Sequence, residues 1–168
     1  MPAGRWQRAA FANSSPRRRN SAPRSKGRTS GTIAPASIEA CIITHAHTDH
    51  MKGAAVARRK WDWALYATAG TAAACAELRD AGVTTFAAGD TLALGRMEVA
   101  THRTPHDCAE PVGAVVTATA SGVRAAICYD IGHVSSGVRT ICRDVDMLVL
   151  EANHDEGMLR AGPYPFVV

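Results

Sequence analysis

Residues 41–50 read CIITHAHTDH, so three histidines and one aspartate directly follow an apolar run. Because such a short, continuous apolar run is typical of a buried strand, we expect a strand over 38–44 and a loop that carries the polar cluster. Alternate residues of an extended segment point to the same side, and the imidazoles of His45 and His47 can therefore converge on one ion. Asp49 and His50 follow in a turn and at the start of a helix, where they can hold a second ion.

This combination of side chains indicates a metal site. Imidazole together with carboxylate suits Zn²⁺, Mn²⁺ or Fe, and two such ions about 3.5–4 Å apart promote hydrolysis. The alternative is that the histidines are exposed or pack one by one, which predicts no shared site. Three histidines and an aspartate in the pattern HxHxDH behind a strand favour the metal site.

Further candidate ligands lie downstream, each at the end of an expected strand. His106 follows the run MEVATH, and Asp130 closes the run ICYD. Each residue alone would be read as a loop or capping residue, but the first cluster makes both of them candidate ligands. A last polar group follows a later apolar run, and we expect it either to hold ligands in place or to cap the next helix: Glu151, Asn153, His154 and Asp155.

Charge divides the chain into two parts. Residues 1–32 carry eight basic and no acidic side chains, whereas the remaining 136 residues carry eleven basic and fifteen acidic ones. The basic isoelectric point therefore belongs to the first part and is no argument that the folded body binds nucleic acid. We expect residues 1–32 to be a disordered basic tail. It is a nucleic-acid-binding arm, a transit-like peptide or an artefact of a wrong start or a shifted reading frame, and we favour the artefact.

Cysteine usage and hydropathy indicate a compartment. The five cysteines are scattered, odd in number and never spaced as CxxC, which favours a reducing compartment without a disulfide framework. No apolar run approaches the roughly 18 residues of a membrane span, and residues 1–32 contain no apolar stretch of about 7–15 residues such as a secretory signal requires. We therefore expect a cytoplasmic protein without membrane contact.

From residue 33 onward, short apolar runs alternate with helical stretches, which favours a single α/β domain over 33–168, a layered sandwich of mixed sheets. The Gly89-Asp90 pair predicts a tight turn between two strands, and the run 146–152 predicts another buried strand. The expected strands cover 38–44, 64–68, 84–88, 91–95, 97–102, 112–120, 123–130 and 146–152, and the expected helices cover 51–61, 70–82 and about 136–143.

The order HxHxDH, a later histidine and then Asp-x-Gly resembles the metallo-β-lactamase superfamily. Four sequence motifs within about residues 38–166 resemble the YycJ/WalJ-like branch of that fold. They are ITHAHTDHMKGA, TPHDCAEPVGAVV, YDIGHVS and LVLEANHDEGML. The resemblance implies that the first ion is bound by His45, His47 and His106. It implies that Asp49 and His50 bind the second ion and that Asp130 bridges both. His133 and His154 would be second-shell or substrate-facing residues.

The resemblance also implies an incomplete metallo-β-lactamase αβ/βα sandwich. Relatives open with a Ser/Gly-rich SSGSxGN stretch and continue to a GHLS segment whose histidine completes the second metal site. Neither motif occurs in this sequence, so we expect a partial domain with a weakened second metal site.

The function implied is a metal-dependent hydrolase, a phosphodiesterase or DNA exonuclease with two Zn or Mn ions, in which Asp49 orients the attacking hydroxide. One alternative is a truncated relative that binds metal without turnover. An amidohydrolase barrel also uses HxH at a strand end, but it needs roughly 250 residues and eight βα units. A nucleic-acid-binding role of the arm alone would show a steep salt dependence. The sequence leaves the oligomeric state open.

Overall fold

The computed structural model describes residues 10–11, 33–151 and 155–162. Its first sheet, the parallel sheet, has the strand order β1-β2-β3-β4, and every neighbouring pair runs parallel. Its strands are β1 (Ala10–Phe11), β2 (Ala40–Ile43), β3 (Ala64–Thr68) and β4 (Thr84–Phe86). Strand β2 is buried along its whole length, as its continuous apolar sequence predicts.

The second sheet, the mixed sheet, has the order β5-β6-β7-β8-β9. Its strands pair antiparallel from β5 to β8, and β9 joins β8 in parallel. The strands are β5 (Thr91–Leu94), β6 (Met97–Arg103), β7 (Val112–Ala118), β8 (Arg124–Cys128) and β9 (Met147–Leu150). A hairpin turn at Ser121-Gly122 joins β7 to β8, as the sequence predicts, and Gly122 adopts a positive φ of 71° there.

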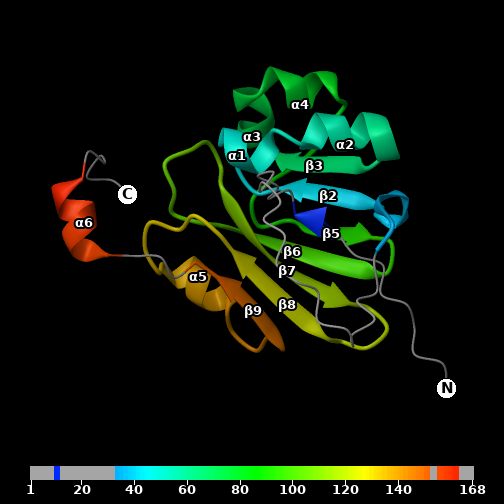
Figure 1. The fold of residues 1–168 in the computed structure, drawn as a ribbon. Coiled ribbons are helices and arrows are strands. Elements are labelled where there is room, and N and C mark those ends of the chain that lie inside the picture. Colours follow the sequence, from blue (N-terminus) through cyan, green and yellow to red (C-terminus); the bar gives the residue numbers. More distant parts are fainter. Residues whose placement is uncertain (1–9, 12–32, 152–154, 163–168) are drawn as a thin grey trace, which may run out of the picture.

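Helices cover the outer faces of the two sheets. Figure 1 shows α1 to α4 over the parallel sheet, α5 against the mixed sheet, and α6 at one side of the molecule. The helices are η1 (Pro35–Ser37), α1 (Thr48–Met51), α2 (Ala54–Trp61), α3 (Ala69–Ala74), α4 (Ala76–Asp80), α5 (Ser136–Ile141) and α6 (Glu156–Ala161). The helix expected over 70–82 is interrupted at Cys75, whose backbone is extended (φ −132°, ψ 111°).

Three apolar clusters fill the spaces between these layers. Cys41 and Ile43 of β2 face the helices and pack with Leu78, whereas Ile42 between them faces the other sheet and packs with Val99. This alternation follows from the pleat of the strand. The third cluster joins Val115, Ala126 and Cys128 of the mixed sheet to Val138 and Ile141 of α5. The order helix, sheet, sheet, helix confirms the predicted α/β sandwich.

One expected turn joins strands of different sheets, and one expectation about strand burial is wrong. The turn near Gly89 is present, but the strands on either side of it do not pair, because β4 belongs to the parallel sheet and β5 to the mixed sheet. Strand β9 was expected to be buried, yet Met147, Leu148 and Leu150 are 58%, 44% and 39% exposed. An apolar run thus predicts a strand, but its burial depends on what packs beside it.

The first part of the chain contributes two described residues. Ala10 and Phe11 pair in parallel with Cys41 and Ile42 at the edge of the parallel sheet. The expected boundary at residue 33 and the disorder of residues 1–32 stay predictions. In the described part of the chain, no helix combines the length and the apolar character that crossing a membrane requires.

Candidate metal centre

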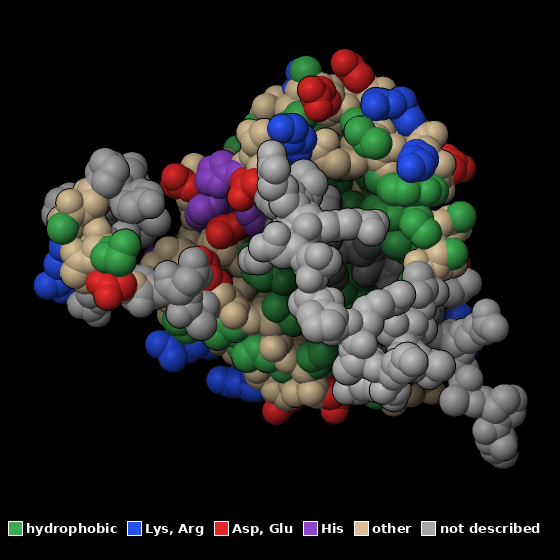
Figure 2. Space-filling model, in the orientation of Figure 1, with side chains coloured by type: hydrophobic (Ala, Val, Ile, Leu, Met, Phe, Trp, Pro, Cys, Tyr) green, Lys and Arg blue, Asp and Glu red, His purple; other side chains and the backbone are tan. Residues whose placement is uncertain are grey.

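The candidate ligands come from three loops that meet at one edge of the sandwich. His45 follows β2, His106 follows β6 and Asp130 follows β8. The backbone ties these loops together, because the Val112 N–H donates to the Thr44 carbonyl at 2.9 Å and the Gly132 N–H donates to the Pro105 carbonyl at 2.8 Å. Figure 2 shows the histidine side chains gathered at one place on the surface, with acidic side chains beside them.

The first donor group consists of three imidazoles. One nitrogen from each of His45, His47 and His106 lies within 4.8 Å of the others. Within this group, His106 Nε2 lies 3.0 Å from His47 Nδ1. His45 is 1% exposed, while the other two imidazoles are half-buried at the mouth of the site. Histidines separated by 59 positions therefore point their nitrogens at a common centre, as the sequence predicts.

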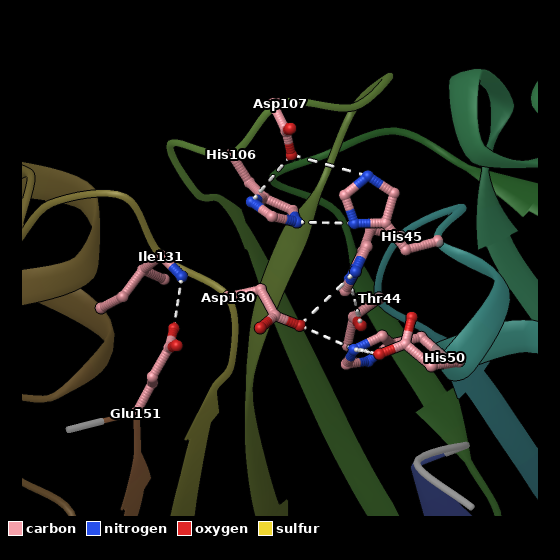
Figure 3. Close-up of polar contacts among 10 residues, drawn as sticks. Thr44, His45, His50, His106, Asp107, Asp130, Ile131 and Glu151 are labelled. Carbon is pink, nitrogen blue, oxygen red and sulfur yellow. Dashed lines mark hydrogen bonds and ion pairs between the residues drawn. The ribbon is translucent and has the colours of Figure 1, made fainter. Parts of the chain in front are cut away.

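The second donor group mixes imidazole with carboxylate. His45, His50 and Asp130 also present ligand atoms within 4.8 Å of one another, so His45 belongs to both groups. Asp130 Oδ2 lies 2.7 Å from His50 Nε2 and 3.5 Å from His45 Nε2 (Figure 3). Asp49 Oδ2 lies 3.4 Å from His50 Nε2, and its side chain is 66% exposed. Asp130 thus lies in the second group, beside the histidine that both groups share, and its bridging role stays a prediction.

The chemistry of these atoms fits a divalent metal. His45 Nε2 and Asp130 Oδ2 are buried and make no well-aligned hydrogen bond among the described residues, although His50 Nε2 lies 2.7 Å from Asp130 Oδ2. Folded proteins rarely tolerate such buried polar atoms unless a ligand satisfies them. Burial, reinforced by the neighbouring His50, lowers the pKa of His45 to about 3. His45 is therefore a neutral imidazole at neutral pH, the form that coordinates metals.

Asp107 is a member of the site that the sequence reasoning missed. Its Oδ1 lies 3.3 Å from His106 Nδ1 and 3.5 Å from His47 Nε2. These are the nitrogens that point away from the 3.0 Å contact between the two rings. A carboxylate on the outer nitrogen is the usual way to orient a metal-binding imidazole. The sequence did contain a signal for Asp107, because this acidic residue directly follows the candidate ligand His106.

The expected supporting residues are placed differently from one another. The Glu151 carboxylate accepts a hydrogen bond of 3.0 Å from the Ile131 N–H, next to Asp130 (Figure 3). Asp155 instead caps α6, because its carboxylate accepts from the Met158 N–H at 2.8 Å, the alternative that the sequence left open. His133 is exposed in the loop before α5. Asn153 and His154 lie outside the described residues.

A four-layered sandwich with histidines and an aspartate at the strand ends of both sheets defines a class of metal-dependent enzyme folds. The family model described as "Beta-lactamase superfamily domain" matches residues 11–164, and the chain belongs to this superfamily, the metallo-β-lactamase fold.

Among curated relatives, the chain is similar to Exodeoxyribonuclease YycJ of Bacillus anthracis, with 33% identity over 135 residues, which cover 78% of this chain and 50% of the relative. Exodeoxyribonuclease WalJ of Streptococcus pneumoniae is 29% identical over 136 residues, which cover 77% of this chain and 50% of that protein. The chain thus spans about half the length of the curated relatives that it matches.

Solved structures share the fold at lower identity. Zn²⁺-bound PqqB from Methylobacterium extorquens superposes with a TM-score of 0.62 and 21% identity over 74% of this chain and 50% of that one. A HARLDQ-motif mutant metallo-β-lactamase from Cronobacter sakazakii gives a TM-score of 0.53 and 19% identity over 69% of this chain and 58% of that one. These likenesses confirm the predicted sandwich.

Proposed function

We propose that this chain is a metal-dependent hydrolase that cleaves phosphodiester bonds in DNA, as an exonuclease, with two Zn or Mn ions. The observation that carries the proposal is the pair of donor groups, each within 4.8 Å, that share His45, with Asp130 Oδ2 3.5 Å from His45 Nε2. Two adjacent sites of this kind suit the in-line displacement at a phosphodiester, in which both the attacking and the leaving oxygen need stabilisation.

Each ligand has a defined part in this proposal. His45, His47 and His106 hold the first ion, and Asp49 and His50 hold the second, with Asp130 between them. When bound, two such ions lower the pKa of water and offset the charge that develops on the reacting oxygens. Asp49 is the most exposed of these side chains, at 66%, which supports the role of orienting the attacking water.

The substrate and the location rest on different observations. Two relatives that cover most of this chain are named exodeoxyribonucleases, which supports DNA as the substrate. Four cysteines, Cys75, Cys108, Cys128 and Cys142, are free, which supports a reducing, cytoplasmic location.

A second candidate function is metal binding without turnover. The asymmetry of the two donor groups favours it, because the second group shares its buried histidine with the first. If the first ion takes His45, the second keeps His50, Asp130 and the exposed Asp49. An ion held by fewer or looser ligands polarises its substrate less effectively.

One experiment decides between these functions. The metal-free chain is loaded with Zn²⁺ or Mn²⁺, the bound ions are counted, and release of nucleotides is followed from linear and circular DNA. We expect two ions per chain and release from linear DNA alone, and no release by the His45→Ala variant. One bound ion without release from either DNA would instead support the second candidate, and a chain that binds no ion would contradict both.

A further inference from the structure

His106 is presented by a loop, residues 104–111, that is closed at its base and held on both sides. The Thr104 N–H donates to the Pro111 carbonyl at 3.0 Å, which closes the base. Before His106, the Pro105 carbonyl accepts from the Gly132 N–H at 2.8 Å, which ties the loop to the turn that carries Asp130. After His106, the loop rests on the start of α3, and this second contact is the more elaborate one.

Three polar contacts join residues 109–110 to the start of α3. Thr68 Oγ1 donates to the Glu110 carbonyl at 2.8 Å, and Thr71 Oγ1 donates to the Ala109 carbonyl at 3.2 Å. The Glu110 carboxylate in turn accepts from the Gly70 N–H at 2.5 Å. Both threonines are 0% exposed. Hydrogen bonds of buried groups, one of them to a carboxylate, are among the stronger ones, so this contact holds the loop firmly.

The backbone of Glu110 shows why the loop needs this support. Glu110 has a φ of +48°, a left-handed conformation that non-glycine residues adopt only at a cost. It also precedes Pro111, which disfavours helical conformations in the residue before it. Strained conformations of this kind persist only where the surrounding structure enforces them. The contacts from α3 are the enforcing structure, and they determine the path of the chain that leads back to His106.

Gly70 leaves the space that this contact requires. A Cβ atom at this position would lie 2.9 Å from both Cγ and Oε2 of Glu110 and 3.1 Å from its Cβ. Separations below 3.0 Å are repulsive, and the clashing atoms are Cγ and Oε2 of the Glu110 side chain. A side chain at position 70 would therefore move Glu110 away from the Gly70 N–H without touching any histidine.

We propose that Glu110 is a positioning residue for the metal centre: by binding the Gly70 N–H, its carboxylate fixes the 104–111 loop so that His106 meets His45 and His47. This inference rests on the proposed function in one respect, that His106 is a metal ligand. Glu110 itself is no ligand, and its effect reaches the ion through the backbone between residues 106 and 110.

The test uses two disturbances of one contact, a rescue and a control. Glu110→Ala removes the carboxylate, and Gly70→Ala displaces it. Glu110→Gln keeps an oxygen that can accept from the Gly70 N–H. Glu77→Ala removes an exposed carboxylate from the neighbouring helix α4 and serves as the control. For each variant, hydrogen exchange is measured on the metal-free chain, and Zn²⁺ affinity is measured by titration.

We expect Glu110→Ala and Gly70→Ala to speed exchange within residues 104–111 while β2 and β7 stay protected. We expect the affinity for the first Zn²⁺ to fall by about tenfold, the lower end of what the loss of an outer-shell partner costs. Glu110→Gln should keep part of the exchange protection and part of the Zn²⁺ affinity. Glu77→Ala should change neither the exchange nor the affinity.

The outcomes separate this inference from the proposed function. Unchanged exchange and affinity in both Glu110→Ala and Gly70→Ala would overturn the inference while leaving the proposed function in place. Faster exchange spread over the whole chain, with equal loss of both ions, would also overturn it, because that is a general loss of stability. Faster exchange confined to 104–111 in Glu110→Ala and Gly70→Ala, together with a wild-type chain that binds no Zn²⁺, would support the positioning of the loop and contradict the proposed function.

Discussion

The two donor groups of the site differ in how the chain builds them. The first group takes His45, His47 and His106 from loops that follow strands of different sheets, with Asp107 on the outer nitrogens of two of them. The second takes His50 from the short helix α1 and Asp130 from a turn where its φ is +48°. The first group thus rests on the packing of two sheets, whereas the second rests on a left-handed turn and an exposed partner, Asp49. His45 connects them.

The largest effect is expected where the groups overlap. His45→Ala removes a buried nitrogen that both groups use, so both ions should lose affinity by more than about 100-fold, since even an outer-shell loss costs about 10–100-fold. Metal content after dialysis and titration with Zn²⁺ or Mn²⁺ check this. Retention of one tightly bound ion would mean that the two donor groups are independent and that sharing His45 does not contribute to the affinity of both ions.

Variants of single groups should separate the two sites. His106→Ala should remove the first ion and spare the second, and His50→Ala should do the reverse. His102→Ala is the matched control, because His102 lies within β6 and pairs in register with Gly113, away from the donor groups. Counting the bound ions in each variant measures the effect. Equal metal loss in His102→Ala and His106→Ala would contradict the assignment of the third histidine.

The outer carboxylate should matter less than any ligand. Asp107→Asn keeps the shape but removes the charge that faces His106 Nδ1 and His47 Nε2, so the first ion should bind about 10–100-fold more weakly. The second ion should hardly change. Competition with a chromophoric chelator resolves the two affinities. A loss of affinity confined to the second ion would show that Asp107 supports the second donor group and not the first.

The smallest effect is expected at the support of the second group. Glu151→Gln weakens the hydrogen bond that the Ile131 N–H makes beside Asp130, from a charged to a neutral acceptor. Such a change is worth about 1 kcal/mol, so the second ion should lose roughly fivefold in affinity. The same titration measures it, with Glu98→Gln on the exposed side of β6 as the control. An unchanged second affinity would show that the turn holds Asp130 without this contact.

The sequence predicted those parts of the molecule that depend on local pattern. The run before His45 is buried on both faces, which makes β2 recognisable from composition alone, and β3 occupies the expected residues 64–68. The HxHxDH spacing is a local signal as well, and the structure brings its three histidines together with His106 and Asp130. Their roles as ligands stay predictions.

The parts that were missed depend on tertiary neighbours. Strand β9 is as apolar as β2, but Met147 and Leu148 are exposed because, among the described residues, only β8 pairs with it. The strands around Gly89 look like a hairpin, yet they enter different sheets. Asp107 became visible as part of the site only when the fold placed His47 beside it. These pairings and contacts join residues that are far apart in the sequence, so no short stretch of sequence reveals them.

Strand β9 has a consequence for how long the site stays assembled. Glu151 follows β9 directly, its N–H donates to the Cys128 carbonyl at 3.1 Å, and its carboxylate holds the Ile131 N–H. The segment that steadies Asp130 is therefore the continuation of the outermost strand of its sheet. Edge strands open locally at a lower free energy than the strands they flank. An opening of β9 would therefore remove the hydrogen bond that Glu151 provides beside Asp130 while His45 and His106 stay in place.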